Sequence, residues 1–157
     1  MKSVTAHAPL MERIFLLGLL LGGACILLHL QPFDITVTSV SLFGLGVAYI
    51  LSAYKPIEIP QNDGETAGMK VLLWYGIIPK VLWISSAVSV IAIALVLLNS
   101  DPRGYKQMFF IGGSTIAVGL VITVGMAVAG LQAIRGIVPI LLRATVLLAV
   151  DVYFLLH

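Results

Sequence analysis

Residues 81–98, VLWISSAVSVIAIALVLL, decide the fold of this chain, because they contain no charged side chain. An α-helix rises about 1.5 Å per residue, so a stretch of this length comes close to spanning a hydrocarbon layer of about 30 Å. Four further apolar stretches of comparable length lie along the 157 residues. The sequence therefore predicts a protein whose body is surrounded by lipid.

The overall composition supports the same prediction. Hydrophobic residues make up 60% of the chain and charged residues 10%, whereas soluble domains contain about 25% charged residues. A water-soluble fold of this length could not cover so much apolar surface. The net charge of +2 is too small to indicate a nucleic-acid partner. The expected partner is the lipid bilayer.

The fold class we expect is all-α, an integral membrane bundle of five transmembrane helices in a single membrane domain over residues 1–157. An open strand would leave its backbone groups unpaired in lipid, so helices are expected even where β-branched residues cluster, as in residues 35–38. The sequence predicts transmembrane helices over residues 14–30, 35–54, 81–98, 107–131 and 137–156.

A polar stretch separates the second and third apolar segments. It runs from Lys55 to Met69 and contains Pro56 and Pro60, which break helices. Residues 70–78 follow, with Trp74 and Tyr75, two side chains that favour the membrane interface. They predict a short interfacial helix over 70–78. The alternative is that they form the first turns of a long, kinked third transmembrane helix.

The distribution of basic residues predicts the orientation. Five spans place six basic residues on one side of the membrane and two on the other, and cytoplasmic loops carry the excess. The N-terminus is therefore expected in the cytoplasm and the C-terminus outside, and the expected membrane is a bacterial inner membrane. The side with the excess holds Lys2, Arg13, Lys55, Lys70, Lys80 and Arg135, and the other side holds Arg103 and Lys106.

A short internal repeat links two regions of the chain. Residues 27–32, LLHLQP, match residues 97–102, LLNSDP, at an offset of 70 positions, and each occurrence ends one helix and precedes another. Coincidence and duplication both remain open as explanations. If the repeat is a duplication, helices one and two form a hairpin that is copied as helices three and four.

Two ionisable residues lie inside the predicted spans, Arg143 and Asp151, both in the last helix. A charge at the bilayer centre costs at least about 2.5 kcal/mol, so such residues are candidates for function. Arg143 can extend to lipid phosphates or pair with another helix or subunit. Asp151 has a short side chain, for which we expect a structural hydrogen bond, with an ion or proton role as the alternative.

Other polar residues give weaker signals. His29 lies at the end of the first helix. We expect it to be solvated or to cap the helix, and the alternative is a functional role through titration near neutral pH. Ser85, Ser86 and Ser89 lie in the third helix without a histidine or acid nearby, so hydroxyl bonds within or between helices are expected. Cys25, the one cysteine, is expected to be a small buried hydrophobe. No spacing predicts a catalytic set, a metal site or a cofactor.

Small residues recur at four-residue spacing on three helices, a pattern that lets helix backbones approach closely. Packing within the chain and packing against a second chain are both open, and the fourth helix carries the longest series and is the candidate oligomer face. Gly112 and Gly113 lack the lysine of a phosphate loop and are interpreted as packing residues. The series comprise Gly18 and Gly22, then Gly44, Ala48 and Ser52, then Thr115, Gly119, Thr123 and Ala127.

The first hairpin carries two further short motifs. Residues 23–29, GACILLH, are followed by a break at Pro32, and residues 51–56, LSAYKP, close the second helix. This pattern resembles the membrane hairpin of the gliding and type IX secretion motor subunit of Bacteroidota, over about residues 14–57. That family has a lysine before the histidine, where this chain has Ile26, and a membrane glutamate in the second helix, where this chain has Gly44 and its neighbours. The resemblance implies a bacterial membrane hairpin, and motor activity is not carried over.

Two functions follow as hypotheses. We favour a non-enzymatic subunit or scaffold of a larger membrane assembly, with homo-oligomers or other membrane subunits as partners, because polar groups are few and small-residue series are many. The alternative is a small oligomeric channel or transporter that uses Arg143, Asp151 and the third-helix serines. A membrane enzyme ranks third, because acids, histidines and cysteines are not clustered.

Overall fold

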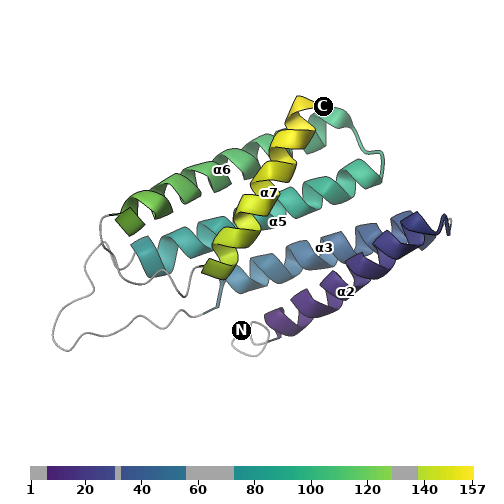
Figure 1. Ribbon diagram of the computed structural model, residues 1–157, viewed down its shortest axis with the longest axis horizontal. Coiled ribbons are helices and arrows are strands. Elements are labelled where there is room, and N and C mark those ends of the chain that lie inside the picture. The colour runs from purple at the N-terminus through teal and green to yellow at the C-terminus, as the bar shows by residue number, and fades with distance from the viewer. Residues whose placement is uncertain (1–6, 31–32, 56–72, 129–137) are drawn as a thin grey trace.

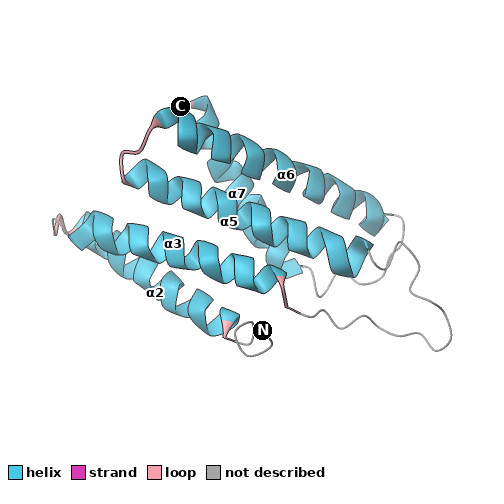
Figure 2. Ribbon diagram, turned by 180° about the vertical axis from the view of Figure 1, so that it is seen from behind, coloured by secondary structure: helices cyan, strands magenta, loops and turns pink. Residues whose placement is uncertain are grey.

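The computed structural model describes residues 7–30, 33–55, 73–128 and 138–157. These residues form a bundle of long helices and contain no strand (Figures 1 and 2). Five of the helices are long and apolar enough to cross a membrane. The expected all-α class and its five candidate spans are therefore confirmed. In chain order, the helices are α2 (Ala8–Leu27), α3 (Phe33–Ala53), α5 (Ile78–Leu97), α6 (Pro102–Val128) and α7 (Val138–Leu156).

Two helices begin five or six residues earlier than the sequence predicts. α2 begins at Ala8 instead of Ile14, with Pro9 in its first turn, where a proline needs no backbone hydrogen bond. The helix therefore includes Glu12, a charged residue that the hydropathy pattern had placed outside the span. α6 begins at Pro102 instead of Gln107, and the Asp101 carboxylate accepts a hydrogen bond from the Arg103 backbone N–H at 3.2 Å.

The start of the third span decides between the two interpretations of residues 70–78. Residues Leu73–Ile77 form η1, a π-helical turn that leads directly into α5 at Ile78. The described part of this stretch therefore runs directly into α5, which favours the alternative of a long third helix for residues 73–77. Pro79 lies in the first turn of α5 and does not end a helix. Residues 70–72 lie outside the described residues, as do 129–131 of the predicted fourth helix.

The bundle consists of two antiparallel hairpins and a last helix laid across them. α2 packs on α3, α3 on α5, and α5 on α6, so the hairpins α2–α3 and α5–α6 lie side by side. α7 crosses α5 and α6 at a slant (Figure 1). Both hairpin turns lie at one end of the bundle, which we call the turn end, and α7 finishes there (Figure 1). α2 begins at the opposite end.

The two hairpin turns share one backbone geometry. His29 and Asn99 both adopt the left-handed region, with φ of 53° and 55°. The N–H of Leu30 donates to the Cys25 carbonyl, and the N–H of Ser100 donates to the Leu95 carbonyl. Together with the bonds from His29 to Ile26 and from Asn99 to Val96, these are matching Schellman caps at the 70-residue offset of the sequence repeat.

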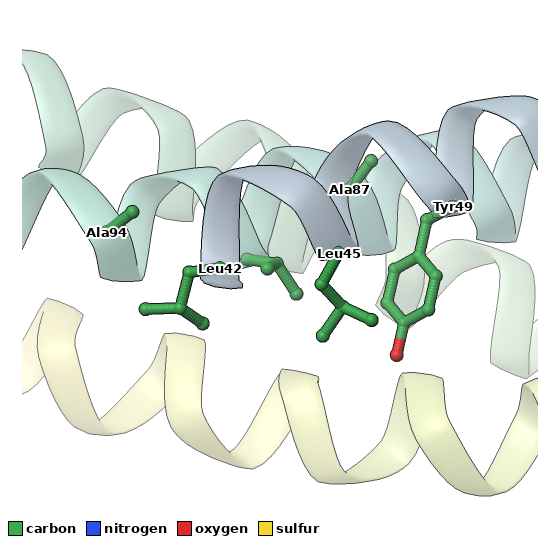
Figure 3. Close-up of a cluster of buried hydrophobic side chains, with 6 residues drawn as sticks. Leu42, Leu45, Tyr49, Ala87 and Ala94 are labelled. Carbon is green, nitrogen blue, oxygen red and sulfur yellow. The ribbon is translucent and has the colours of Figure 1, made fainter. Parts of the chain in front are cut away.

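Two apolar clusters form the core. The first lies between α3 and α5 and contains Leu42, Leu45, Tyr49, Ala87, Val90 and Ala94 (Figure 3). The second joins α5, α6 and α7 and contains Ile78, Leu82, Ile116, Ile140 and Ala144. α5 contributes to both clusters and contacts α3, α6 and α7, so it is the central helix.

Small residues hold the helix pairs together within the chain. Gly18 faces Ser41 and Gly22 faces Thr38 across the α2–α3 contact, and a Cβ atom at either glycine would collide with its partner. Gly44 faces the Phe15 ring in the same way, and Ala48 is fully buried on α3.

The small-residue series on α6 is also used inside the chain. A Cβ atom at Gly119 would lie 2.8 Å from the Leu82 side chain of α5, and Thr123 is buried, with its hydroxyl donating to the Gly119 carbonyl at 2.7 Å. Thr115 donates to the Ile111 carbonyl at 2.7 Å. The Gly119 and Thr123 face, proposed from the sequence as an oligomer surface, is thus covered by the chain's own helices.

Candidate functional site

The first polar contact inside the bundle joins α2 to α7. Arg143 Nη2 lies 2.7 Å from Glu12 Oε1, with side chains that are 37% and 11% exposed. The guanidinium N–H bonds do not point along this line, so the contact is an ion pair without hydrogen-bond geometry. Arg143 therefore pairs with a neighbouring helix, which is one of the two roles expected for it.

Two aromatic rings extend this ion pair across the bundle. The Arg143 guanidinium carbon lies 5.5 Å from the centre of the Trp83 ring, a cation–π distance. Trp83 in turn lies 5.1 Å, centroid to centroid, from Tyr49 on α3. Figure 3 shows the Tyr49 hydroxyl directed away from its own helix, toward α7. We call Glu12, Tyr49, Trp83 and Arg143 the charged node.

The second polar contact joins α7 to α5. The Ser89 hydroxyl donates to Asp151 Oδ2 at 2.6 Å, and both residues are fully buried. The other carboxyl oxygen, Oδ1, has no hydrogen-bond partner among the described residues. The structural hydrogen bond expected for Asp151 is therefore present, but only half of the carboxyl group takes part in it. We call Asp151 and Ser89 the carboxyl node.

Two adjacent glycines of α6 make room for the carboxyl node. A Cβ atom at Gly113 would lie 3.1 Å from Asp151 Cβ and 3.3 Å from its Oδ2. A Cβ atom at Gly112 would lie 2.6 Å from Ser89 Oγ. The hydrogen bond between α5 and α7 fits beside α6 because both positions lack side chains. The packing role that the sequence predicts for this glycine pair thus serves a buried polar group.

An aromatic stack separates the carboxyl node from the turn end. Phe109 of α6 and Phe154 of α7 lie parallel, with ring centroids 5.0 Å apart and an interplanar angle of 5°. Phe109 is fully buried. Phe109 precedes Gly113 by one helical turn and Phe154 follows Asp151 by about one turn, so the stack covers the node on that side.

The remaining predicted residues lie apart from both nodes. His29 is the left-handed residue of the first cap, so the structure gives it the capping role. Ser85 and Ser86 are buried on α5, and the Ser86 hydroxyl has no described hydrogen-bond partner. Cys25 is half-buried, not fully buried. Among the described residues, no three histidine, cysteine, aspartate or glutamate side chains gather as a metal site.

Glu12 is the residue that sequence reasoning missed. It was assigned to a segment before the first span, because the uninterrupted apolar stretch begins only after Glu12 and Arg13. Pro9, three positions earlier, was a signal for an earlier helix start. A helix beginning there brings Glu12 into the bundle, where it contacts Arg143 of α7.

Comparison with protein-family models, with curated proteins and with solved structures finds no match for this chain. The resemblance of the first hairpin to a motor subunit therefore stays a prediction. The two nodes differ in that Glu12 has a cation beside it, whereas Asp151 has one hydroxyl donor and no cation among its described contacts.

Proposed function

We propose that this chain is a non-enzymatic subunit or scaffold of a larger membrane assembly. The observation that carries the proposal is the presence of unpacked glycines on the outer helices. A Cβ atom at Gly23 on α2 or at Gly125 on α6 would meet nothing within 4 Å. Packing against the described residues requires neither glycine, whereas it requires Gly18, Gly22 and Gly119.

Bare glycines on a lipid-facing helix suit contact with another helix. Helix association in lipid depends on close backbone approach, because lipid tails are as apolar as leucine side chains. Gly125 lies among large exposed residues of α6, including Val121, Ile122 and Val124. We therefore assign the contact with a partner helix to the surface around Gly125. The Gly119 and Thr123 face predicted from the sequence packs against helices of the same chain.

The orientation belongs to the same proposal. The excess of basic residues in the segments before α2, between α3 and α5, and between α6 and α7 favours the cytoplasmic side for the end where α2 begins. The turn end, with Arg103 and Lys106, then faces outward. A bacterial inner membrane suits this topology, and cysteine labelling at each end in intact cells would test it.

The assembly proposal is tested by the oligomeric state of the full chain. The protein is extracted with its lipids into nanodiscs and weighed by native mass spectrometry. We expect a species larger than one chain, which Gly125→Leu disperses and Val124→Leu, a matched change at an exposed neighbour, leaves intact. A Cβ atom at position 125 meets none of the described residues within 4 Å, so we expect the effect of Gly125→Leu to come from a partner. A single chain in the unsubstituted protein contradicts the proposal.

The second candidate function is a small channel or transporter, which the carboxyl node favours. An acid buried inside a membrane bundle with an unpartnered oxygen is a functional candidate by default. Ion or proton flux into vesicles that contain the protein tests this candidate. Flux that is absent, or that is unchanged by Asp151→Asn, removes Asp151 from such a pathway.

A further inference from the structure

We infer that Asp151 is a proton-binding site, held as a neutral carboxyl group beside Ser89 and sealed from the turn end by the Phe109–Phe154 stack. The ligand is a proton, and the site belongs to the described bundle whether or not the chain has partners. The inference deepens the transporter candidate, but it concerns the state of the carboxyl group and does not need ions to cross the membrane.

The first support is the lack of a compensating charge. α5 faces Asp151 with the Ser89 hydroxyl, and α6 faces it with Gly112 and Gly113, none of which is charged. On α7 itself, Arg143 lies eight positions away, about 12 Å along the axis, and is paired with Glu12. Among the described residues, an ionised Asp151 would have one hydrogen-bond donor and no cation beside it, although it is fully buried.

The second support is the hydrogen-bond inventory of the carboxyl group. An ionised carboxylate offers about four lone-pair positions and is expensive to bury unless several are filled. Here Ser89 fills one position on Oδ2, and Oδ1 has no described partner. A carboxylic acid leaves only neutral groups unpaired, so the observed surroundings fit the protonated form. The charged node supplies the contrast, because Glu12 has a guanidinium at 2.7 Å.

The third support is the position of the aromatic stack. The titratable residues nearest to Asp151 on the turn-end side are Tyr105 and Lys106 on α6, and Tyr153 and His157 on α7. Tyr105 contacts Phe109, and Tyr153 contacts both Phe154 and His157. These residues thus stand at or beyond the stack, and Phe109 and Phe154 separate them from the carboxyl group. We therefore expect these two rings to slow a proton that approaches Asp151 from the turn end.

Infrared spectroscopy of the full chain in lipid vesicles tests the protonation state. A protonated carboxylic acid has a carbonyl stretch that is separate from the bands of a carboxylate. At neutral pH we expect this band in the unsubstituted protein, its loss in Asp151→Asn, and its retention in Glu12→Gln. A spectrum without the band, or a band that disappears with Glu12→Gln instead, overturns the proposal.

Exchange into D₂O tests the seal. We expect the carbonyl band to shift slowly in the unsubstituted protein, and about tenfold faster in Phe154→Ala, because the stacked pair and its burial oppose local opening. Phe154→Leu retains an apolar side chain and should give an intermediate exchange rate. This variant still tests the seal if Phe154→Ala does not fold. Phe110→Ala, at an exposed neighbour on α6, should leave the rate unchanged. Equal rates in all four proteins overturn the seal.

The outcomes separate this inference from the two functions proposed above. A protonated Asp151 in a protein that is monomeric in nanodiscs supports the proton site and contradicts the assembly proposal. A protonated Asp151 without flux leaves the site standing and removes the transporter. An ionised Asp151 removes the site and leaves the assembly untouched.

Discussion

The two polar nodes of α7 each accommodate a buried acidic side chain, but by different contacts. At the charged node, Arg143 and Glu12 neutralise each other at 2.7 Å, and Trp83 lies against the guanidinium group. At the carboxyl node, Asp151 has a single hydroxyl donor and a close fit against two glycines. The difference teaches that α7 is anchored by charge near its beginning and by shape near its end.

The comparison also explains the slanted path of α7. Arg143 ties α7 to the first hairpin through α2, whereas Asp151 ties it to the second hairpin through α5. α7 packs extensively on α5 and α6 but not on α2, so the ion pair links it to a helix that it otherwise hardly contacts. Breaking one node should therefore release a different part of the bundle than breaking the other.

The largest expected effect is at the charged node. Arg143→Leu leaves Glu12 buried without a cation, which should lower the unfolding free energy by about 3 kcal/mol, near the low end for buried pairs because Arg143 is partly exposed. Unfolding in lipid bicelles measures the change. The double variant Glu12→Leu, Arg143→Leu should recover most of the loss, and a double variant as unstable as the single one would show that charge is not what anchors this end.

The next effect tests shape at the carboxyl node. Gly112→Ala places a methyl group 2.6 Å from Ser89 Oγ, so the Ser89 side chain must move and its bond to Asp151 is strained. We expect a loss of about 2 kcal/mol in unfolding free energy. Gly104→Ala is the matched control, because a Cβ atom there meets nothing within 4 Å, and it should be neutral or stabilising. Equal effects of the two changes would refute a shape-based anchor.

A smaller effect is expected from the single hydroxyl donor. Ser89→Ala removes the bond to Asp151 Oδ2 and should cost about 1 kcal/mol, the usual net value of a hydrogen bond to a neutral group. Thr145→Ala on the exposed side of α7 is the comparison, since its hydroxyl bonds only to the Leu141 carbonyl of its own helix. A loss well above 3 kcal/mol for Ser89→Ala would indicate a charged partner.

The smallest effect separates the two acids directly. Asp151→Asn keeps the shape and the acceptor oxygen of a neutral carboxyl group, so its unfolding free energy should change by less than about 1 kcal/mol. Glu12→Gln leaves the Arg143 guanidinium without its countercharge and should cost more. The two variants are compared in the same bicelles at neutral pH. A reversed order would mean that Asp151, not Glu12, carries the charge.

The fold was predictable from the sequence because the hydrocarbon layer sets a single length for every apolar helix. The existence and type of all five spans followed from that length, and the repeat LLHLQP–LLNSDP located two turns that turned out to share one cap. Helix starts were less predictable. α2 begins at Ala8 and α6 at Pro102, several residues before the uninterrupted apolar stretches, because a helix can include polar turns near an interface.

The candidate sites were predictable only in part. Arg143 and Asp151 stand out in the sequence because charges are rare in such helices, but their partners do not. Glu12 lies 131 positions before Arg143 and Ser89 lies 62 before Asp151, and only the packing of α7 across the hairpins brings these pairs together. The fit of Gly112 and Gly113 against the carboxyl node likewise depends on helix register, which composition does not encode.

The matching caps have a practical consequence for work on this protein. Each turn depends on one residue with a left-handed backbone, and the chain uses His29 and Asn99 where glycine would fit without steric cost. These two positions lie on the connections, away from Glu12, Arg143, Ser89 and Asp151. We therefore expect His29→Gly and Asn99→Gly together to raise the stability of the protein without changing the surroundings of Glu12 or Asp151.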